Sequence, residues 1–270
     1  MPNSRAIKEV SQAWPVVEIF GPTVQGEGVD QGAVCHFVRF GGCDFKCEWC
    51  DTPDAVLPSE VRKATRMSKE DIVRELGILT GPDPWHPPWV ILSGGNPALH
   101  DLASLVDLLH EEGYLVAVET QGTKWRKWMA KVDRLCVSPK PPSSGMVHKG
   151  SSLQQFLQFG LEAKTGGERG YEWLFLKVVI FNEDDLDFAE RIRSQFSDAL
   201  LYLSAGNDAG RTVGNPARVD KRSIEEVKLD LLDRSEWLVG EVFKRPFLAV
   251  PDVLIQSQYH VLLWGNKKGV

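Results

Sequence analysis

Three cysteines close together are the strongest sign of chemistry in this sequence. Cys43, Cys47 and Cys50 follow the spacing C-x3-C-x2-C, directly after Gly41 and Gly42. Thiolates are soft ligands that suit zinc or an iron–sulfur cluster. A structural zinc site is normally closed by four ligands, whereas three thiolates on a four-iron cluster leave one iron open to a substrate or cofactor. Unliganded thiols, buried or reactive, are the remaining alternative.

The composition places these cysteines in an ordinary globular chain. The 270 residues are 43% hydrophobic and 25% charged, which excludes disordered and fibrous classes. The net charge of −6 disfavours a nonspecific nucleic-acid binder, so we expect no nucleic-acid partner. The longest apolar run, residues 174–181, contains Lys177 and is too short to cross a membrane.

The cysteine count and the N-terminal segment both indicate a cytoplasmic enzyme. Five cysteines are an odd number, which argues against a disulfide framework in a chain without a signal peptide. We expect Cys35 and Cys136, which lie in apolar strand-like segments, to be small buried residues. Residues 1–13 contain no apolar run, and we expect them to form a flexible leader.

Strand-like segments alternate with helix-like segments along the whole chain. This alternation predicts an α/β fold with parallel strands and crossover helices, in a single domain spanning residues 1–270. The predicted strands are Val16–Phe20, Val34–Phe40, Trp89–Leu92, Leu115–Glu119, Arg134–Val137, Trp173–Phe181 and Leu200–Leu203. The predicted helices are Lys69–Leu79, Leu99–Glu112, Asp184–Phe196 and Lys221–Leu232. Ser68 and Asp71 resemble a capping box that opens the first of these helices.

Polar, mostly glycine-rich segments follow the first five predicted strands. Ligand groups in such folds lie on loops beyond the carboxyl ends of the strands. We therefore expect these five segments to form one active-site rim. In chain order they read GPTVQGEG, GGCDFKCEWCDT, SGGNP, ETQGT and SPKPPSS.

The cysteine segment resembles the signature of the radical S-adenosylmethionine (SAM) enzymes, including the aromatic Trp49 before the last cysteine. The resemblance implies a partial (β/α) barrel and a [4Fe-4S] cluster on Cys43, Cys47 and Cys50. It further implies that SAM chelates the fourth iron and yields a 5′-deoxyadenosyl radical.

The segment Gly94–Pro97 resembles the family's Gly-Gly-Glu-Pro motif, which holds the amino group of SAM. This sequence has Asn96 in place of the usual glutamate, so an amide oxygen would accept without charge assistance. For Trp49 the alternative is a plain core anchor. The SAM-binding residues that the resemblance implies are Glu48, Trp49, Cys50, Gly95, Asn96, Ser138, Pro139 and Lys140.

Further segments resemble the 7-carboxy-7-deazaguanine synthase family, from about Val16 to the C-terminus. These segments are Gly21–Gly28, Cys50–Thr52, Glu119–Thr123 and the tail from His260. The resemblance implies a lyase that converts 6-carboxy-5,6,7,8-tetrahydropterin to 7-carboxy-7-deazaguanine plus ammonia, in queuosine and 7-deazapurine biosynthesis. It implies that SAM is used catalytically and that the tail 251–270 closes over the active site.

The same resemblance implies a pterin site and a magnesium ligand, Thr52. For Arg39 the alternative is an ordinary ion pair, and for Asp51 and Thr52 it is a capped turn. The implied substrate-binding residues are Val24, Gln25, Gly26, Glu27, Arg39, Ser93, His260 and Val270.

Two other functions compete with the lyase. One is a radical SAM activase that acts on a glycyl-radical partner, and the other is a non-enzymatic iron–sulfur or zinc protein. For the lyase, the implied partners are a flavodoxin or ferredoxin as electron donor and a second copy in a homodimer, with no membrane partner. The sequence assigns no role to the proline-rich segment Gly81–Pro88.

Overall fold

The computed structural model describes most of the chain. The predicted leader, apart from its last two residues, and the predicted loop Gly81–Pro88, apart from Gly81, lie outside the described residues. No helix in the described part is long and apolar enough to cross a membrane. The structure describes residues 12–81, 89–147, 152–156, 158–159, 173–208, 213 and 220–270.

One nine-stranded sheet organises the described residues, in the order β3-β1-β2-β4-β5-β6-β7-β8-β9. The sheet is open, with β3 and β9 at its edges, which agrees with the predicted α/β partial barrel. The strands are β1 (Ala13–Val24), β2 (Val34–Phe40), β3 (Thr65–Ser68), β4 (Trp89–Gly94), β5 (Leu115–Thr120), β6 (Arg134–Val137), β7 (Leu174–Ile180), β8 (Leu200–Ala205) and β9 (Val253–Gln256).

The prediction of parallel strands is correct from β2 onward and wrong for β1. Each neighbouring pair from β2–β4 to β8–β9 is parallel, but β1 is antiparallel to both β2 and β3. Residues 25–33 join β1 to β2, and this connection is too short for the crossover that a parallel pair requires. The segment Gly21–Val24, expected in a loop, is instead the end of β1.

All four predicted helices are present, but α3 and α6 begin later than predicted and α6 also ends later. Ser68 caps α2 through a capping box, as predicted. The helix expected from Leu99 begins at Ala103, because Asn96 caps a separate 3₁₀ turn, η2 (Pro97–Leu99). The helices with described bounds are α1 (Pro58–Val61), α2 (Lys69–Thr80), α3 (Ala103–Glu111), α5 (Glu183–Gln195), α6 (Ile224–Phe243) and α7 (Tyr259–Trp264), and the other 3₁₀ turns are η1 (Pro53–Ala55), η3 (Lys127–Lys131) and η4 (Pro142–Ser144).

Helix α6 extends well past its predicted end at Leu232. Leu238 and Val242 are buried and continue the apolar face begun by Val227 and Leu231. None of residues 233–236 is buried, so the buried positions of α6 are interrupted between Leu231 and Leu238. The four-residue edge strands β3 and β9 were not predicted because their patterns are so short.

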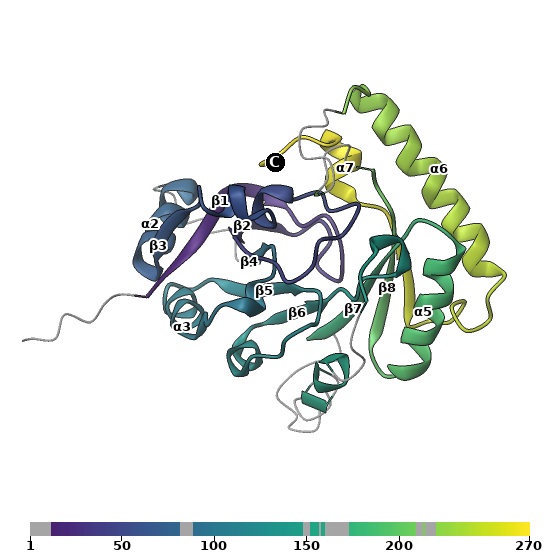
Figure 1. Ribbon diagram of the computed structural model, residues 1–270, viewed down its shortest axis with the longest axis horizontal. Helices are drawn as coiled ribbons and strands as arrows, with labels where there is room; N and C mark the ends of the chain where they lie inside the picture. The colour runs from purple at the N-terminus through teal and green to yellow at the C-terminus, as the bar shows by residue number, and fades with distance from the viewer. Residues whose placement is uncertain are drawn as a thin grey trace, which may run out of the picture.

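The two faces of the sheet differ in chemistry. Because side chains alternate along β2, Val38 and Phe40 lie in the main core on one face of the sheet. Figure 1 shows that helices cover this outer face of the curved sheet. Phe37 and Arg39 take the opposite, inner face. On that face, apolar side chains lie toward the amino ends of the parallel strands and polar ones toward the carboxyl ends. The polar inner residues are Arg39, Ser93, Glu119, Lys177 and Ser204.

Candidate active site

The cysteine loop, residues 41–52, begins at the carboxyl end of β2. Cys43, Cys47 and Cys50 all line one cavity of about 190 Å³, here called the cysteine-loop cavity. Burial raises the pKa of Cys43 to about 11 and that of Cys50 to about 12, and it also raises the pKa of Cys47. The free thiols are therefore protonated at neutral pH, and a bound metal centre would ionise them.

The donor set of this loop fits an iron–sulfur cluster. The backbone N–H of Phe45 donates to Cys43 Sγ at 3.4 Å, and Gln121 Nε2 donates to the same sulfur at 3.6 Å. Such N–H···S contacts favour a thiolate. Across the described residues, no three His, Cys, Asp or Glu side chains form a site for a single metal ion. A four-iron cluster binds each thiolate at a different iron, so its ligands need not converge on one point.

The glycines at the end of β4 allow the backbone to pack against the cysteine loop. Gly95 N donates to Phe40 O at 2.9 Å, and Asn96 N donates to Gly42 O at 2.7 Å. A Cβ on Gly95 would lie 2.1 Å from that Gly42 oxygen. Only glycine therefore fits where the β4 loop meets the cysteine loop.

Substituting Gly95→Ala is expected to destabilise the protein by about 3 kcal/mol, since the added methyl group meets backbone rather than a movable side chain. The midpoint of chemical unfolding measures this loss. Gly77→Ala is the matched control, because a Cβ there meets nothing within 4 Å and alanine is the better helix former. Equal midpoints for the two variants would contradict the close approach.

Asn96, predicted to bind SAM, makes hydrogen bonds within the rim with both ends of its side-chain amide. Its side chain is fully buried and does not line the cysteine-loop cavity. Its oxygen accepts from Ala98 N at 3.2 Å and Thr120 Oγ1 at 2.8 Å, and its nitrogen donates to Asp44 and Thr123. The amide therefore caps η2 and ties together three loops of the rim.

Of the other predicted SAM residues, five line the cysteine-loop cavity, whereas Glu48 and Pro139 do not. Trp49 lies 5.3 Å from Phe181 between ring centroids, and Lys140 Nζ lies 5.7 Å from the Trp49 ring. Glu48 is exposed, and Pro139 is buried without lining the cavity. The predicted SAM residues that line the cysteine-loop cavity are Trp49, Cys50, Gly95, Ser138 and Lys140.

Arg39, predicted to bind the substrate carboxylate, also forms the ion pair given as its alternative. Its Nε lies 2.8 Å from Glu18 Oε1, and its Nη1 donates to Thr52 Oγ1 at 3.5 Å. Thr52 donates to Asp51 Oδ1 at 2.7 Å and makes no side-chain cap to η1, so the capped-turn interpretation is wrong for Thr52. The guanidinium remains in contact with both cavities.

The second cavity, about 630 Å³, is here called the tail cavity because residues 265–270 line it. Its volume lies within the roughly 300–1,000 Å³ typical of ligand pockets. His260 and Val270, both predicted to approach the substrate, line it as well. Arg39, Asp51 and Thr52 line both cavities. One predicted substrate residue, Arg39, and the predicted magnesium ligand, Thr52, therefore lie where the cavities meet.

The β1–β2 connection crosses the inner face of the sheet and places Glu27 beside β7 and β8. Glu27 accepts from Lys177 Nζ at 2.8 Å and from Ser204 Oγ. Burial opposes ionisation of Glu27, but the charge of Lys177 outweighs it and holds the pKa of Glu27 at about 2. The same pairing raises the pKa of Lys177 against the effect of its own burial. A buried, fully ionised pair therefore lines the cysteine-loop cavity.

Gln25 and Gly26 support this connection rather than lining either cavity. Gln25 Nε2 donates to Glu119 Oε1 at 3.1 Å. Gly26 O accepts from Tyr259 N at 2.9 Å, and a Cβ on Gly26 would lie 1.8 Å from His260 Nδ1. Burial lowers the pKa of His260 despite the nearby Glu27 carboxylate, so the imidazole is neutral at pH 7. Val24 remains in β1, paired with Val34.

Several polar residues of the site were not predicted from the sequence. Lys177 had a usable signal, since it is the only charged residue in the apolar run 174–181. Ser93 was predicted, and its buried Oγ has no hydrogen-bond partner among the described residues, as expected of a ligand-facing group. Glu119, Thr120 and Gln121 line the cysteine-loop cavity and belong to the predicted rim segment ETQGT, although no individual role was predicted for them. Residues that line the cavity from outside the predicted segments include Lys177, Asn207 and Gln258.

Comparison with known proteins defines the class first. Residues 37–139, which contain the cysteine loop and the β4 and β5 ends, match the model of the radical SAM superfamily. The crystal structure of QueE from Escherichia coli superposes with a TM-score of 0.59, covering 92% of this chain and 95% of that chain at 21% identity. That likeness concerns the fold, and it agrees with the open α/β sheet described above.

Full-length relatives then define the family. The 7-carboxy-7-deazaguanine synthase of Bacillus cereus is 37% identical over 257 residues, covering 95% of this chain and 98% of the relative. The Bacillus subtilis protein of the same name is 39% identical over 257 residues, with the same coverage. This chain belongs to the 7-carboxy-7-deazaguanine synthase family.

Proposed function

We propose that this protein converts 6-carboxy-5,6,7,8-tetrahydropterin to 7-carboxy-7-deazaguanine with loss of ammonia, as a radical SAM lyase of queuosine and 7-deazapurine biosynthesis. The observation that carries the proposal is the junction of the two cavities. The cysteine-loop cavity contains all three cysteines, and it shares Arg39 and Thr52 with the tail cavity. Family membership favours this lyase over the activase and the non-enzymatic alternatives.

The residues of the cysteine-loop cavity suit the cofactors of this class. Cys43, Cys47 and Cys50 would hold a [4Fe-4S] cluster, and the surfaces of Trp49 and Gly95 would border SAM. When bound, these cofactors supply the one-electron chemistry that generates a carbon-centred radical beside the substrate. The protein's own contribution is to position the substrate and to exclude water and competing donors.

The substrate would lie against charged groups of fixed orientation. Arg39 offers a planar fork to the pterin carboxylate, while Glu27, held ionised by Lys177, offers acceptors to the pterin N–H groups. The tail 251–270, with His260 and the terminal carboxylate of Val270, would close the outer side. Thr52 would provide one hard oxygen ligand to Mg²⁺, which keeps several waters and takes further oxygens from its substrate.

Anaerobic turnover of the cluster-reconstituted protein tests the proposal. The reaction contains SAM, dithionite, Mg²⁺ and the carboxytetrahydropterin, and mass spectrometry identifies the product. Formation of the deazaguanine without stoichiometric 5′-deoxyadenosine is the expected result. Cleavage of SAM with untouched pterin would retain the class of protein but reject the substrate. Turnover with flavodoxin or ferredoxin in place of dithionite tests the proposed cytoplasmic electron donor. The oligomeric state of the protein in solution tests the proposed homodimer.

Replacing Arg39 with lysine is expected to raise the KM for the pterin about tenfold, because one charge-assisted hydrogen bond of roughly 1.5 kcal/mol is lost. Steady-state kinetics at saturating SAM measures the effect. Arg245→Lys is the control, since Arg245 pairs with Asp187 at 2.6 Å and lines neither cavity. If the KM is unchanged by Arg39→Lys, the Glu18 ion pair is the whole role of this arginine.

A further inference from the structure

Asn207 lies at the carboxyl end of β8, just beyond Ala205, and lines both cavities. Its Oδ1 atom is buried and has no hydrogen-bond partner among the described residues. A buried amide oxygen without a donor is unfavourable, and a ligand N–H or O–H would remove that cost.

The orientation of the Asn207 amide follows from its other end. Asn207 Nδ2 donates to Asn266 Oδ1 at 2.7 Å, so the oxygen of Asn207 faces the other way. Asn266 follows α7 in the tail, and its own orientation is determined in turn. Asn266 Nδ2 donates to Asp220 Oδ2 at 2.8 Å and to Asp208 O at 3.4 Å. Both of these partners can only accept, so the Asn266 amide cannot be reversed.

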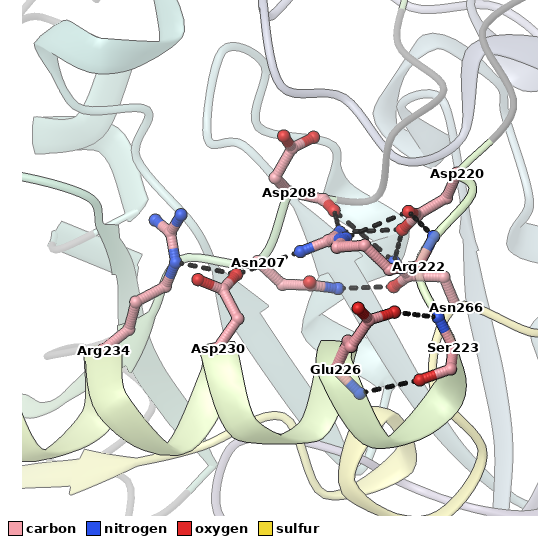
Figure 2. Close-up of polar contacts among 9 residues, drawn as sticks. All are labelled: Asn207, Asp208, Asp220, Arg222, Ser223, Glu226, Asp230, Arg234 and Asn266. Atoms are coloured by element: carbon pink, nitrogen blue, oxygen red, sulfur yellow. Dashed lines mark hydrogen bonds and ion pairs between the residues drawn. The ribbon is translucent and has the colours of Figure 1, made fainter.

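Arg222 anchors the far end of this chain of hydrogen bonds. Its Nε and Nη2 donate to the two oxygens of Asp220 at 2.9 and 2.7 Å, and its Nη1 donates to Asp230 Oδ2 at 3.1 Å. This pairing holds the pKa of Asp220 well below its usual range, so Asp220 remains a carboxylate acceptor. Figure 2 shows the resulting series of contacts from Arg222 through Asp220 and Asn266 to Asn207.

We propose that Asn207 is a substrate-binding residue whose side-chain oxygen accepts a hydrogen bond from an N–H group of the pterin, with Asn266 as its positioning residue. The choice of substrate over SAM rests on location, because Arg39 and Thr52 are also shared by the two cavities. The inference rests on the proposed function, since it names a contact to that substrate. It links the tail to the site through Asn266, in addition to His260.

Equilibrium binding to the cluster-loaded protein tests the inference independently of turnover. The dissociation constants for SAM, and for the pterin at saturating SAM, are measured anaerobically by calorimetry. Asn207→Leu preserves size but removes the acceptor, and is expected to weaken pterin binding about tenfold while SAM binding changes less than twofold. Asn207→Asp keeps an acceptor at the cavity and is expected to bind the pterin more tightly than Asn207→Leu does.

Two variants separate positioning from general loosening of this region. Asn266→Ala frees the Asn207 amide and is expected to weaken pterin binding about threefold. Ser223→Ala removes only the cap of α6, where Ser223 Oγ accepts from Glu226 N at 3.2 Å, and should leave both dissociation constants unchanged. It therefore controls for destabilisation of α6, while SAM binding within twofold of wild type shows that each Asn207 variant is folded.

The outcomes are distinguishable. Wild-type protein that binds the pterin, with unchanged affinity in Asn207→Leu, would overturn the inference alone. Weakened SAM binding with unchanged pterin binding would overturn it too, because the acceptor would then serve the cofactor. Wild-type protein that takes up the cluster and SAM but does not bind the pterin would overturn the proposed function and the inference together.

Discussion

Replacing Cys47 with alanine is expected to abolish cluster binding and turnover together. Cys47 is buried and lines the cysteine-loop cavity with Cys43 and Cys50. The loop holds three thiols, so loss of one leaves two loop thiolates for four irons. Cys136, the other cysteine that lines this cavity, lies in β6 and not in the loop. Turnover should fall by at least ~10³-fold, because the cofactor carries the difficult chemistry. Iron and sulfide analysis and the visible absorbance of the reconstituted protein measure cluster binding directly.

Cys35→Ala is the matched control for this substitution. Cys35 is fully buried among Phe37, Ile91 and Ala117 and lies outside both cavities. Alanine there should cost about 1 kcal/mol of stability while cluster content and turnover are retained. A cluster that survives Cys47→Ala, or one that is lost equally in Cys35→Ala, would contradict the assignment of the three loop cysteines as ligands.

The second large effect concerns the buried pair of Glu27 and Lys177. Their side chains are only 11% and 10% exposed, with 2.8 Å between Oε2 and Nζ. Lys177→Met removes one partner and leaves the other charge buried, which typically costs about 3–5 kcal/mol. The expected fall in the thermal midpoint is on the order of 10 °C. Turnover should fall as well, since both residues line the cysteine-loop cavity.

Two further variants distinguish the pair from an ordinary surface contact. Lys244→Met breaks a pair with Glu241 at 2.7 Å, in which the lysine is 69% exposed, and should cost less than about 1 kcal/mol. The double variant Glu27→Gln/Lys177→Met buries no net charge and should recover much of the lost stability. If Lys177→Met is no more destabilised than Lys244→Met, the pair contributes nothing to the fold.

Acid unfolding gives an independent measure of the same carboxylate. The pKa of Glu27 is about 2 in the folded chain against an ordinary value of 4.5. Its stabilising contribution is therefore complete above pH 4.5 and is lost as the pH falls toward 2, because the unfolded chain takes up the proton first. Glu27→Gln should flatten this part of the profile of unfolding free energy against pH.

Most of the fold could be predicted from local pattern. Period-2 alternation in β2 and the capping box of α2 were both sufficient, since each depends on residues close together in the chain. The direction of β1 was predicted wrongly, because parallel and antiparallel partners share the same alternation. The extent of α6 was also missed, since only the packed position of Leu238 distinguishes a continuing helix from a charged end.

The cluster motif was determined by the sequence alone, and the environment of the substrate by the tertiary structure. Cys43, Cys47 and Cys50 can be recognised as cluster ligands from the sequence because they lie in one short loop. Their sulfurs therefore line one cavity independently of how distant segments pack. Glu27 meets Lys177 across 150 positions, and Asn207 meets Asn266 across 59. Such contacts depend on strand order and on the direction of β1. No periodicity within one segment encodes them, because each requires two distant segments to be packed on the same sheet.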